Sequence, residues 1–191
     1  LQEGYRLISG EGWDPESMSL GAYRPVEPLK SLFFCPREDV SAGAAPESPE
    51  EVPERIILGV KNCDLSALRI HDYVFRDLAP ADPFYCALRE RTVLVTCDCT
   101  DARETCFCPA VGEQPYPREG YDINLSPVEE VYVVEAGSER GQALLEAATD
   151  LLRHAGETVM QRRDEARAAM TEKVAELAAH KGLTPDMPLR E

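Results

Sequence analysis

Two short apolar runs on either side of one amphipathic segment restrict the fold more than any other feature of this sequence. The runs RIILGVK (55–61) and RTVLVTCD (91–98) show no polar alternation, which is typical of strands covered on both faces. The segment 63–78 between them predicts a helix with one buried face, capped at its N-terminus by Asp64. The apolar positions of that face are Leu65, Leu68, Ile70 and Val74. Strand, helix and strand in this order predict a right-handed crossover with two parallel strands.

The C-terminal half predicts a hairpin followed by helices. Two extended runs flank SPVEE (126–130), a pattern typical of an antiparallel hairpin. One helix is expected from Glu139 to about Gly156, and a second over roughly 157–181. The second has an apolar stripe of Ala166, Met170, Val174 and Leu177. We therefore expect an α/β fold: a small mixed sheet with a βαβ unit, an antiparallel hairpin and C-terminal helices. Residues 1–156 would form the cysteine-cluster domain and 157–191 a helical tail.

The N-terminal part contains weaker signals. LKSLFFCP (29–36) suggests a short strand that ends at Pro36. Residues 41–54 are rich in proline, small residues and glutamate, so we expect a surface loop with almost nothing to bury.

Charge and hydropathy exclude several classes of partner. The net charge of −15 argues against nucleic acid, whose binding depends on Lys and Arg, and against docking on an anionic membrane surface. No apolar run approaches the roughly 18 residues that suggest a membrane span, so no membrane insertion is expected. The first residues do not follow the pattern of a signal peptide, and we expect a cytoplasmic protein.

Four of the seven cysteines lie in CDCTDARETCFC (97–108). Cys97 and Cys99 follow the second predicted strand, and Cys63 follows the first. The carboxyl ends of neighbouring parallel strands meet at one edge of a sheet, where α/β proteins bind their ligands. We therefore expect Cys63 to lie beside the 97–108 loop.

Thiols gathered in this way repel one another as thiolates, and a metal ion or cluster removes that penalty. Two ligand sets are open: the local Cys97, Cys99, Cys106 and Cys108, or Cys63 with the last three. The C-x-C pairs fit neither the C-x₂₋₄-C knuckles of zinc sites nor the usual ferredoxin run. The spacing therefore indicates a metal or cluster site without identifying it. A disulfide between Cys99 and Cys106, or free thiols packed as small hydrophobic residues, are the alternatives.

Four longer stretches together resemble a known family. They are GVKNCDLSALRIHDYVF, DPFYCALRERTVLVTCDCTDARETCFC, EGYDINL and YVVEAGSERG. The chain from about residue 4 to 165 resembles the N-terminal region of the β subunit of cytoplasmic sulfhydrogenases, a region shared with the electron-transfer subunit of anaerobic sulfite reductase. The resemblance implies an iron–sulfur electron-transfer subunit of a larger oxidoreductase.

The most specific part of the resemblance is the pairing of CDL-x-AL with C-T-x₅-C-F-C. This pairing selects Cys63, Cys99, Cys106 and Cys108 as the cluster ligands, with Cys97 as a reserve ligand. Cys35 and Cys86 are expected to be buried small residues. The chain departs from the family at PAVGEQPYP (109–117), where members have a Gly-rich stretch, and it ends without their ferredoxin-like module. Either the chain is a fragment, or another subunit supplies that relay.

The resulting hypothesis is a non-catalytic electron-transfer subunit or domain of a cytoplasmic hydrogenase-like or sulfite-reductase-like complex. Its cofactor would be one [4Fe–4S] cluster, with [2Fe–2S] or zinc as alternatives. Its partners would be ferredoxin-like, flavin or hydrogenase subunits. Phe107, between two ligands, would shield the cluster or fill the core. The competing hypotheses are a scaffold braced by Cys₄ zinc with no redox role, and an enzyme that uses Cys99 or Cys106 as a redox-active thiol pair.

Overall fold

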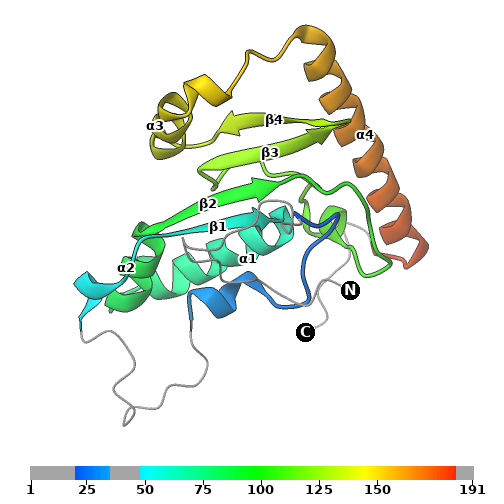
Figure 1. Cartoon of the computed structure of the whole chain (residues 1–191). Helices are drawn as coiled ribbons and strands as arrows, with labels where there is room; N and C mark the ends of the chain where they lie inside the picture. Colours follow the sequence, from blue (N-terminus) through cyan, green and yellow to red (C-terminus); the bar gives the residue numbers. More distant parts are fainter. Residues whose placement is uncertain (1–19, 35–47, 184–191) are drawn as a thin grey trace.

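The computed structural model describes residues 20–34 and 48–183, and its centre is a mixed four-stranded sheet (Figure 1). The strands are β1 (Arg55–Val60), β2 (Thr92–Cys97), β3 (Ile123–Val128) and β4 (Val131–Ala136), in the spatial order β1-β2-β3-β4. β1 pairs with β2 and β2 with β3 in parallel, whereas β3 and β4 form an antiparallel hairpin. The predicted α/β class, with a parallel βαβ unit and a hairpin, is confirmed.

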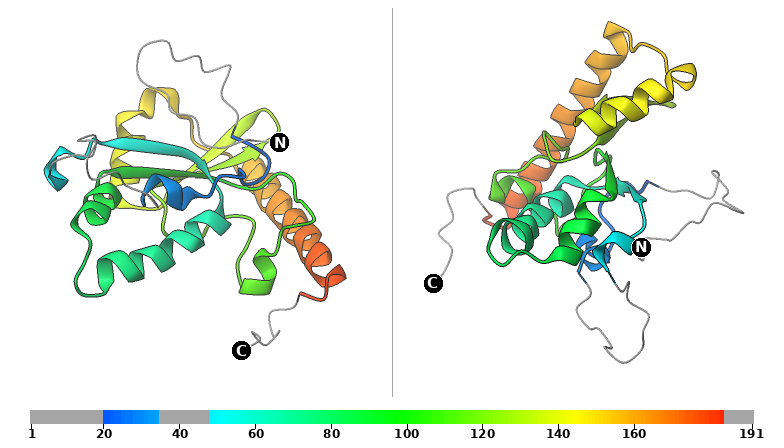
Figure 2. Two further views of the ribbon diagram at one scale, coloured as in Figure 1. Left: turned by 90° about the horizontal axis from the view of Figure 1, so that it is seen from below. Right: turned by 90° about the vertical axis from the view of Figure 1, so that its left-hand side faces the viewer.

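Helices connect the strands and flank the sheet. They are α1 (Asn62–Asp72), which continues into a π-helical turn (Tyr73–Asp77), α2 (Pro83–Glu90), α3 (Glu139–Ala147) and α4 (Glu157–His180). The 3₁₀ turns are Leu29–Leu32, Pro49–Glu51, Cys108–Val111 (η5) and Thr149–Leu151. α1 and α2 accompany β1 and β2, whereas the long α4 crosses the β3–β4 end of the sheet (Figures 1 and 2).

The apolar core lies between α1, α2 and the first two strands. Ile57 of β1 and Leu94 of β2 point into it, as do Leu65 and Leu68 of α1. The remaining buried members are Leu29, Phe33, Val60 and Tyr85. Most of these side chains are no more than about 3% exposed, so this part of the molecule is held together by the removal of apolar surface from water.

A buried carboxylate fastens α1 to α2. The Tyr85 hydroxyl donates to Asp72 Oδ1 (2.7 Å), and Arg89 donates to both carboxylate oxygens (2.7 and 2.9 Å). Burial alone would raise the pKa of Asp72, but the hydrogen bonds from Arg89 and Tyr85 outweigh it and hold that pKa below its usual value.

A second carboxylate, Asp122, fastens the sheet to α3. Its oxygens accept from the Leu94 amide (2.8 Å), the Ser138 hydroxyl (2.6 Å) and the Arg140 guanidinium (3.0 Å). Ser138 also caps α3, since its Oγ accepts from the Gly141 amide (3.0 Å). A Cβ at Gly141 would lie 1.8 Å from the Asp122 carbonyl oxygen, so the helix approaches β3 closely only because residue 141 is glycine.

α4 meets the sheet through arginines. Arg167 donates to the carboxylates of Asp98 (2.7 Å) and Glu135 (2.8 Å), and Arg163 donates to the other oxygen of Glu135 (2.6 Å). Asn124 completes this group by donating to Asp98 (2.9 Å). Further along, Val174 and Ala178 are buried where α4 packs on η5 and β3. One helix thus contacts both the hairpin and the turn that begins at Cys108.

Several predicted helix details were wrong. α3 ends at Ala147 and not near Gly156, because the Thr149 hydroxyl donates to the Glu146 carbonyl and a 3₁₀ turn follows. The buried face of α4 includes Arg163, Val174 and Ala178, whereas the predicted Ala166 is exposed.

The other differences concern helix α1 and the N-terminal part. The N-cap of α1 is Lys61, and Asp64 lies buried in the first turn. Residues 29–32 form a 3₁₀ turn in place of the predicted strand, which lets Leu29 and Phe33 enter the core together. Cys35 and Pro36 lie outside the described residues, as does the first half of the predicted 41–54 loop. Val52, near the end of that segment, is 2% exposed and is an exception to the expectation that the loop has almost nothing to bury.

Candidate cysteine site

The site is built at the carboxyl ends of β1 and β2. Cys63 lies in the first turn of α1, directly after β1, and Cys99 lies two residues beyond β2. Cys106 follows in the connecting loop, and Cys108 begins η5. Because β1 and β2 are parallel neighbours, both strand ends open onto the same edge of the sheet, as the sequence predicts.

Hydrogen bonds fold the chain after Cys108 back onto both strand ends. Asn62 Nδ2, beside Cys63, donates to the Gln114 carbonyl (2.9 Å) and to Glu113 Oε2 (3.0 Å). The Cys99 amide donates to the Pro115 carbonyl (2.9 Å). The Glu113 amide donates to the Cys108 carbonyl (2.9 Å), which closes the turn. Segments far apart in sequence, carrying Cys63, Cys99 and Cys108, are thereby tied to one place.

The loop that carries Cys106 is held from two further sides. The amides of Thr100 and Asp101 donate to the Ala22 carbonyl (3.0 and 3.2 Å), so residues before the sheet support it. From α4, Lys173 pairs with the Asp101 carboxylate (2.6 Å). Inside the loop, the Arg103 amide donates to Cys106 Sγ (3.2 Å). Such N–H···S bonds favour a thiolate over a thiol.

The thiols of Cys63, Cys99 and Cys108 each have a raised pKa, to which neighbouring cysteines contribute. Burial raises the pKa of Cys63 well above its usual range, and Cys108 and Cys99 raise it further. Burial raises the pKa of Cys99 to about 12, with added contributions from Cys108 and Cys106. Burial and the neighbouring Cys106 also raise the pKa of Cys108. Neighbouring thiols therefore disfavour ionisation of Cys63, Cys99 and Cys108, which is the penalty that a bound cation would remove.

The remaining cysteines take different places. Cys97, the reserve ligand, ends β2 and is 1% exposed. Cys86 lies on α2 and is half-buried, so the prediction that it is a buried small residue was wrong in degree. Cys35 lies outside the described residues. Within residues 20–34 and 48–183, no three His, Cys, Asp or Glu side chains are arranged to hold a metal ion as they stand.

Two buried charged residues border the site. The side chain of Lys61 is 0% exposed, and its Nζ donates to the carbonyls of Cys97 (3.2 Å) and Asp98 (3.1 Å). Asp64 is 3% exposed and pairs with Arg24 (3.4 Å). Burial raises the pKa of Asp64 against the opposing effect of Arg24. The sequence interpretation missed Lys61, although a lysine that directly follows an apolar strand run was a visible signal.

The surface beside the cysteines is apolar. Phe107 is 49% exposed and Val111 is 61% exposed, on either side of Cys108. Phe107 therefore does not fill the core, which was one of its two predicted roles.

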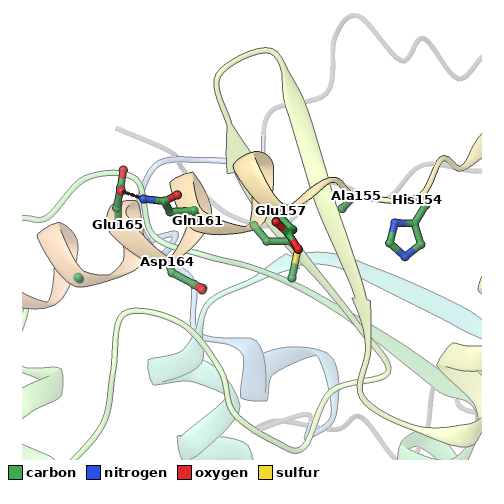
Figure 3. A pocket seen from close by; sticks show the side chains of 8 residues that line it. His154, Ala155, Glu157, Gln161, Asp164 and Glu165 are labelled. Atoms are coloured by element: carbon green, nitrogen blue, oxygen red, sulfur yellow. Dashed lines mark hydrogen bonds between the residues drawn. The ribbon is translucent and has the colours of Figure 1, made fainter.

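A separate hollow lies at the start of α4 (Figure 3). Its lining consists of His154, Ala155, Glu157, Met160, Gln161, Asp164, Glu165 and Ala168. All of these residues belong to residues 154–168, and Gln161 and Glu165 hydrogen-bond to each other across it (2.9 Å). The hollow is a feature of one helix and its entry, and it shares no lining residue with the cysteine site.

None of the helices in the described part of the chain is long and apolar enough to cross a membrane. The longest, α4, carries charged residues along its whole length. Comparison of the chain with known protein families, with characterised proteins and with solved structures finds no match.

Proposed function

We propose that the chain is an iron–sulfur electron-transfer subunit or domain of a larger cytoplasmic oxidoreductase of the hydrogenase-like or sulfite-reductase-like kind. The cluster would be [4Fe–4S], held by Cys63, Cys99, Cys106 and Cys108. The resemblance of the cysteine-bearing stretches to sulfhydrogenase β subunits supports this proposal. No role as acid, base or nucleophile is assigned, and the chemistry would take place in a partner protein.

One observation carries the proposal: the hydrogen bonds of Asn62 and of the Cys99 amide to residues 114 and 115. They bring the end of β1, the end of β2 and the turn of Cys108 together. The parallel pairing of β1 and β2 already places the two strand ends side by side, and these bonds add the turn of Cys108 to them. The mutual rise of the thiol pKa values supports the same grouping.

The donor set suits an iron–sulfur cluster. Four thiolates are its usual ligands, and N–H groups directed at sulfur together with burial set its reduction potential. In this chain the Arg103 amide is such a donor, to Cys106. Cys108 is buried and Cys63 and Cys99 are half-buried, so neighbouring residues keep part of the solvent away from the site. The cluster, when bound, would accept and release one electron at a time.

The position of the site also suits exchange of electrons with another protein. The loop that carries Cys106 is at the surface, next to the exposed Phe107 and Val111. A partner that covers these two side chains would bring its own redox centre close to the cysteines. We propose ferredoxin-like, flavin-containing or hydrogenase subunits as such partners.

Zinc is the second candidate, because four thiolates also form structural zinc sites. In that case the chain would be a scaffold whose loop is braced by the metal, and it would be colourless. Metal analysis separates the two proposals directly.

The test is anaerobic purification followed by iron, sulfide and zinc analysis and an absorbance spectrum. We expect about four irons and four sulfides per chain and a broad band near ~400 nm that dithionite bleaches. Two irons would keep the electron-transfer proposal and change the cluster type. One zinc per chain without iron would overturn it in favour of the scaffold.

Single substitutions test the ligand set. We expect Cys63→Ser and Cys106→Ser to lose most of the iron, whereas Cys86→Ser, on α2, retains it as the matched control. Cys97→Ser is also expected to retain it. Loss of iron in Cys97→Ser with retention in Cys63→Ser would replace the proposed set with the local one of Cys97, Cys99, Cys106 and Cys108.

A further inference from the structure

Lys61 is a fully buried cation at the edge of the cysteine site. It follows β1 directly and precedes Cys63 by two positions, and its side chain is 0% exposed. Nζ donates to the carbonyls of Cys97 and Asp98, at the end of β2. Lys61 also lowers the pKa of the Cys97 thiol, against the larger opposing effect of burial. The ammonium group therefore lies between the ends of β1 and β2.

This cation has no carboxylate partner among the described residues. Asp98, whose carbonyl it binds, directs its carboxylate instead to Arg167 (2.7 Å) and Asn124 (2.9 Å). Backbone carbonyls and a thiol supply dipoles but no negative charge. A buried charge is costly unless an opposite charge compensates it. Lysine is almost never fully buried without such a partner.

The groups that could supply negative charge are the cysteines. Lys61 acts on Cys99 and Cys97, lowering the pKa of each against the larger opposing effect of burial. A set of four thiolates around iron and sulfide carries a net negative charge, and so complements a lone buried ammonium.

We propose that Lys61 is the built-in counter-charge of the bound cluster, a positioning residue that raises its reduction potential and favours its retention. This inference rests on the proposed iron–sulfur function. Reduction adds one electron from an external donor to the cluster and makes it more negative by one charge. No bond forms or breaks at Lys61. A fixed positive charge stabilises the reduced form more than the oxidised form.

The expected effect is large enough to measure. A unit charge about 10 Å away, at an effective dielectric constant of about 20, changes the reduction equilibrium roughly tenfold. For a one-electron couple a tenfold change corresponds to ~59 mV. Removal of the charge should lower the midpoint potential by about that amount.

The experiment compares midpoint potentials by anaerobic redox titration with mediators, following the EPR signal of the reduced cluster. Lys61→Gln removes the charge and keeps an N–H donor for the carbonyls, whereas Lys61→Arg keeps the charge. Lys173→Gln is the matched control, because Lys173 is also near the loop but is half exposed and screened by water. We expect a lower potential in Lys61→Gln, and values close to wild type in Lys61→Arg and Lys173→Gln.

Each outcome supports or overturns the role of Lys61 as a counter-charge. If Lys61→Gln has the wild-type potential, the inference is overturned while the iron–sulfur proposal stands. If Lys61→Gln loses its cluster but Lys61→Arg keeps it, with unchanged circular dichroism in both, the need for a positive charge is supported. Loss of the cluster in both variants indicates a packing role and overturns the inference. Absence of iron from wild-type protein overturns the proposed function and this inference with it.

Discussion

The two ends of the sheet are held by different forces. Around β1 and β2, α1 and α2 bury Leu and aromatic side chains in one apolar core. At the β3–β4 end, α4 is joined through Arg163 and Arg167 to carboxylates of the sheet. The first end resembles the interior of any small domain, and the second is a network of charges and hydrogen bonds.

The difference concerns specificity more than total stability. Apolar contacts are non-directional and tolerate small shifts of a helix. A guanidinium that bridges two carboxylates fixes both position and rotation. Since α4 also packs on η5 and pairs with the cysteine loop through Lys173, the direction of α4 determines where that loop lies. The polar end of the sheet therefore positions the candidate site.

The largest loss of stability is expected from a cavity in the apolar core between α1, α2, β1 and β2. Leu94 is 2% exposed at the centre of the core, and Leu94→Ala should reduce the free energy of unfolding by about 3 kcal/mol. Urea denaturation of the purified protein measures this. Leu151→Ala, at a side chain that is 86% exposed, is the control and should change stability by less than about 0.5 kcal/mol. Equal effects in both variants would contradict the assignment of the core.

A smaller and more local loss of stability is expected where the arginines of α4 pair with carboxylates at the β3–β4 end of the sheet. Arg167→Gln leaves the buried Asp98 without its cation, whereas Glu135 keeps its pair with Arg163, and the change should cost about 2 kcal/mol. Amide exchange should show faster opening of α4 than of β2. The control is Arg162→Ala, whose pair with Glu129 is exposed and should contribute less than about 0.5 kcal/mol. Uniform exchange across α4 and the sheet in Arg167→Gln would show that α4 does not open separately.

The smallest loss of stability is expected on substitution of Asp72, and this loss depends on pH. Its folded-state pKa is lowered, so its contribution to stability is complete above the unfolded pKa of about 3.9 and is lost as pH falls through the folded pKa. At pH 7, Asp72→Asn should be less stable than wild type by about 1 kcal/mol. This difference should shrink below about pH 4. Urea denaturation between about pH 3 and 7 checks it, and a constant difference would contradict the proposed ionic contribution.

Much of the fold could be predicted from the sequence. The apolar runs of β1 and β2 and the hairpin of β3 and β4 have periodicities that are local, and local patterns can be found by inspection. The position of Cys63 beside the 97–108 loop could also be expected, because the carboxyl ends of two neighbouring parallel strands lie at the same edge of the sheet.

The remainder depends on contacts between distant residues. The buried face of α4 escaped prediction because it includes Arg163, and an arginine is interpreted as a solvated residue until its carboxylate partner is known. The length of α3 depended on the competing hydrogen bond of Thr149. Lys61 escaped notice as a site residue for the same reason as Arg163, since its burial depends on carbonyls that lie 36 and 37 positions later.

The close approach of Gly141 to Asp122 bears on how relatives of this chain could be recognised. The two glycines of GSERG (137–141) do not have the spacing of a dinucleotide fingerprint, and Ser138, Arg140 and Gly141 all lie against Asp122. A distant homologue with the same packing should carry an aspartate at the start of β3 and a serine and glycine three positions apart at the start of α3. That combination would be a diagnostic of the scaffold, and it would remain informative in sequences that have lost every cysteine.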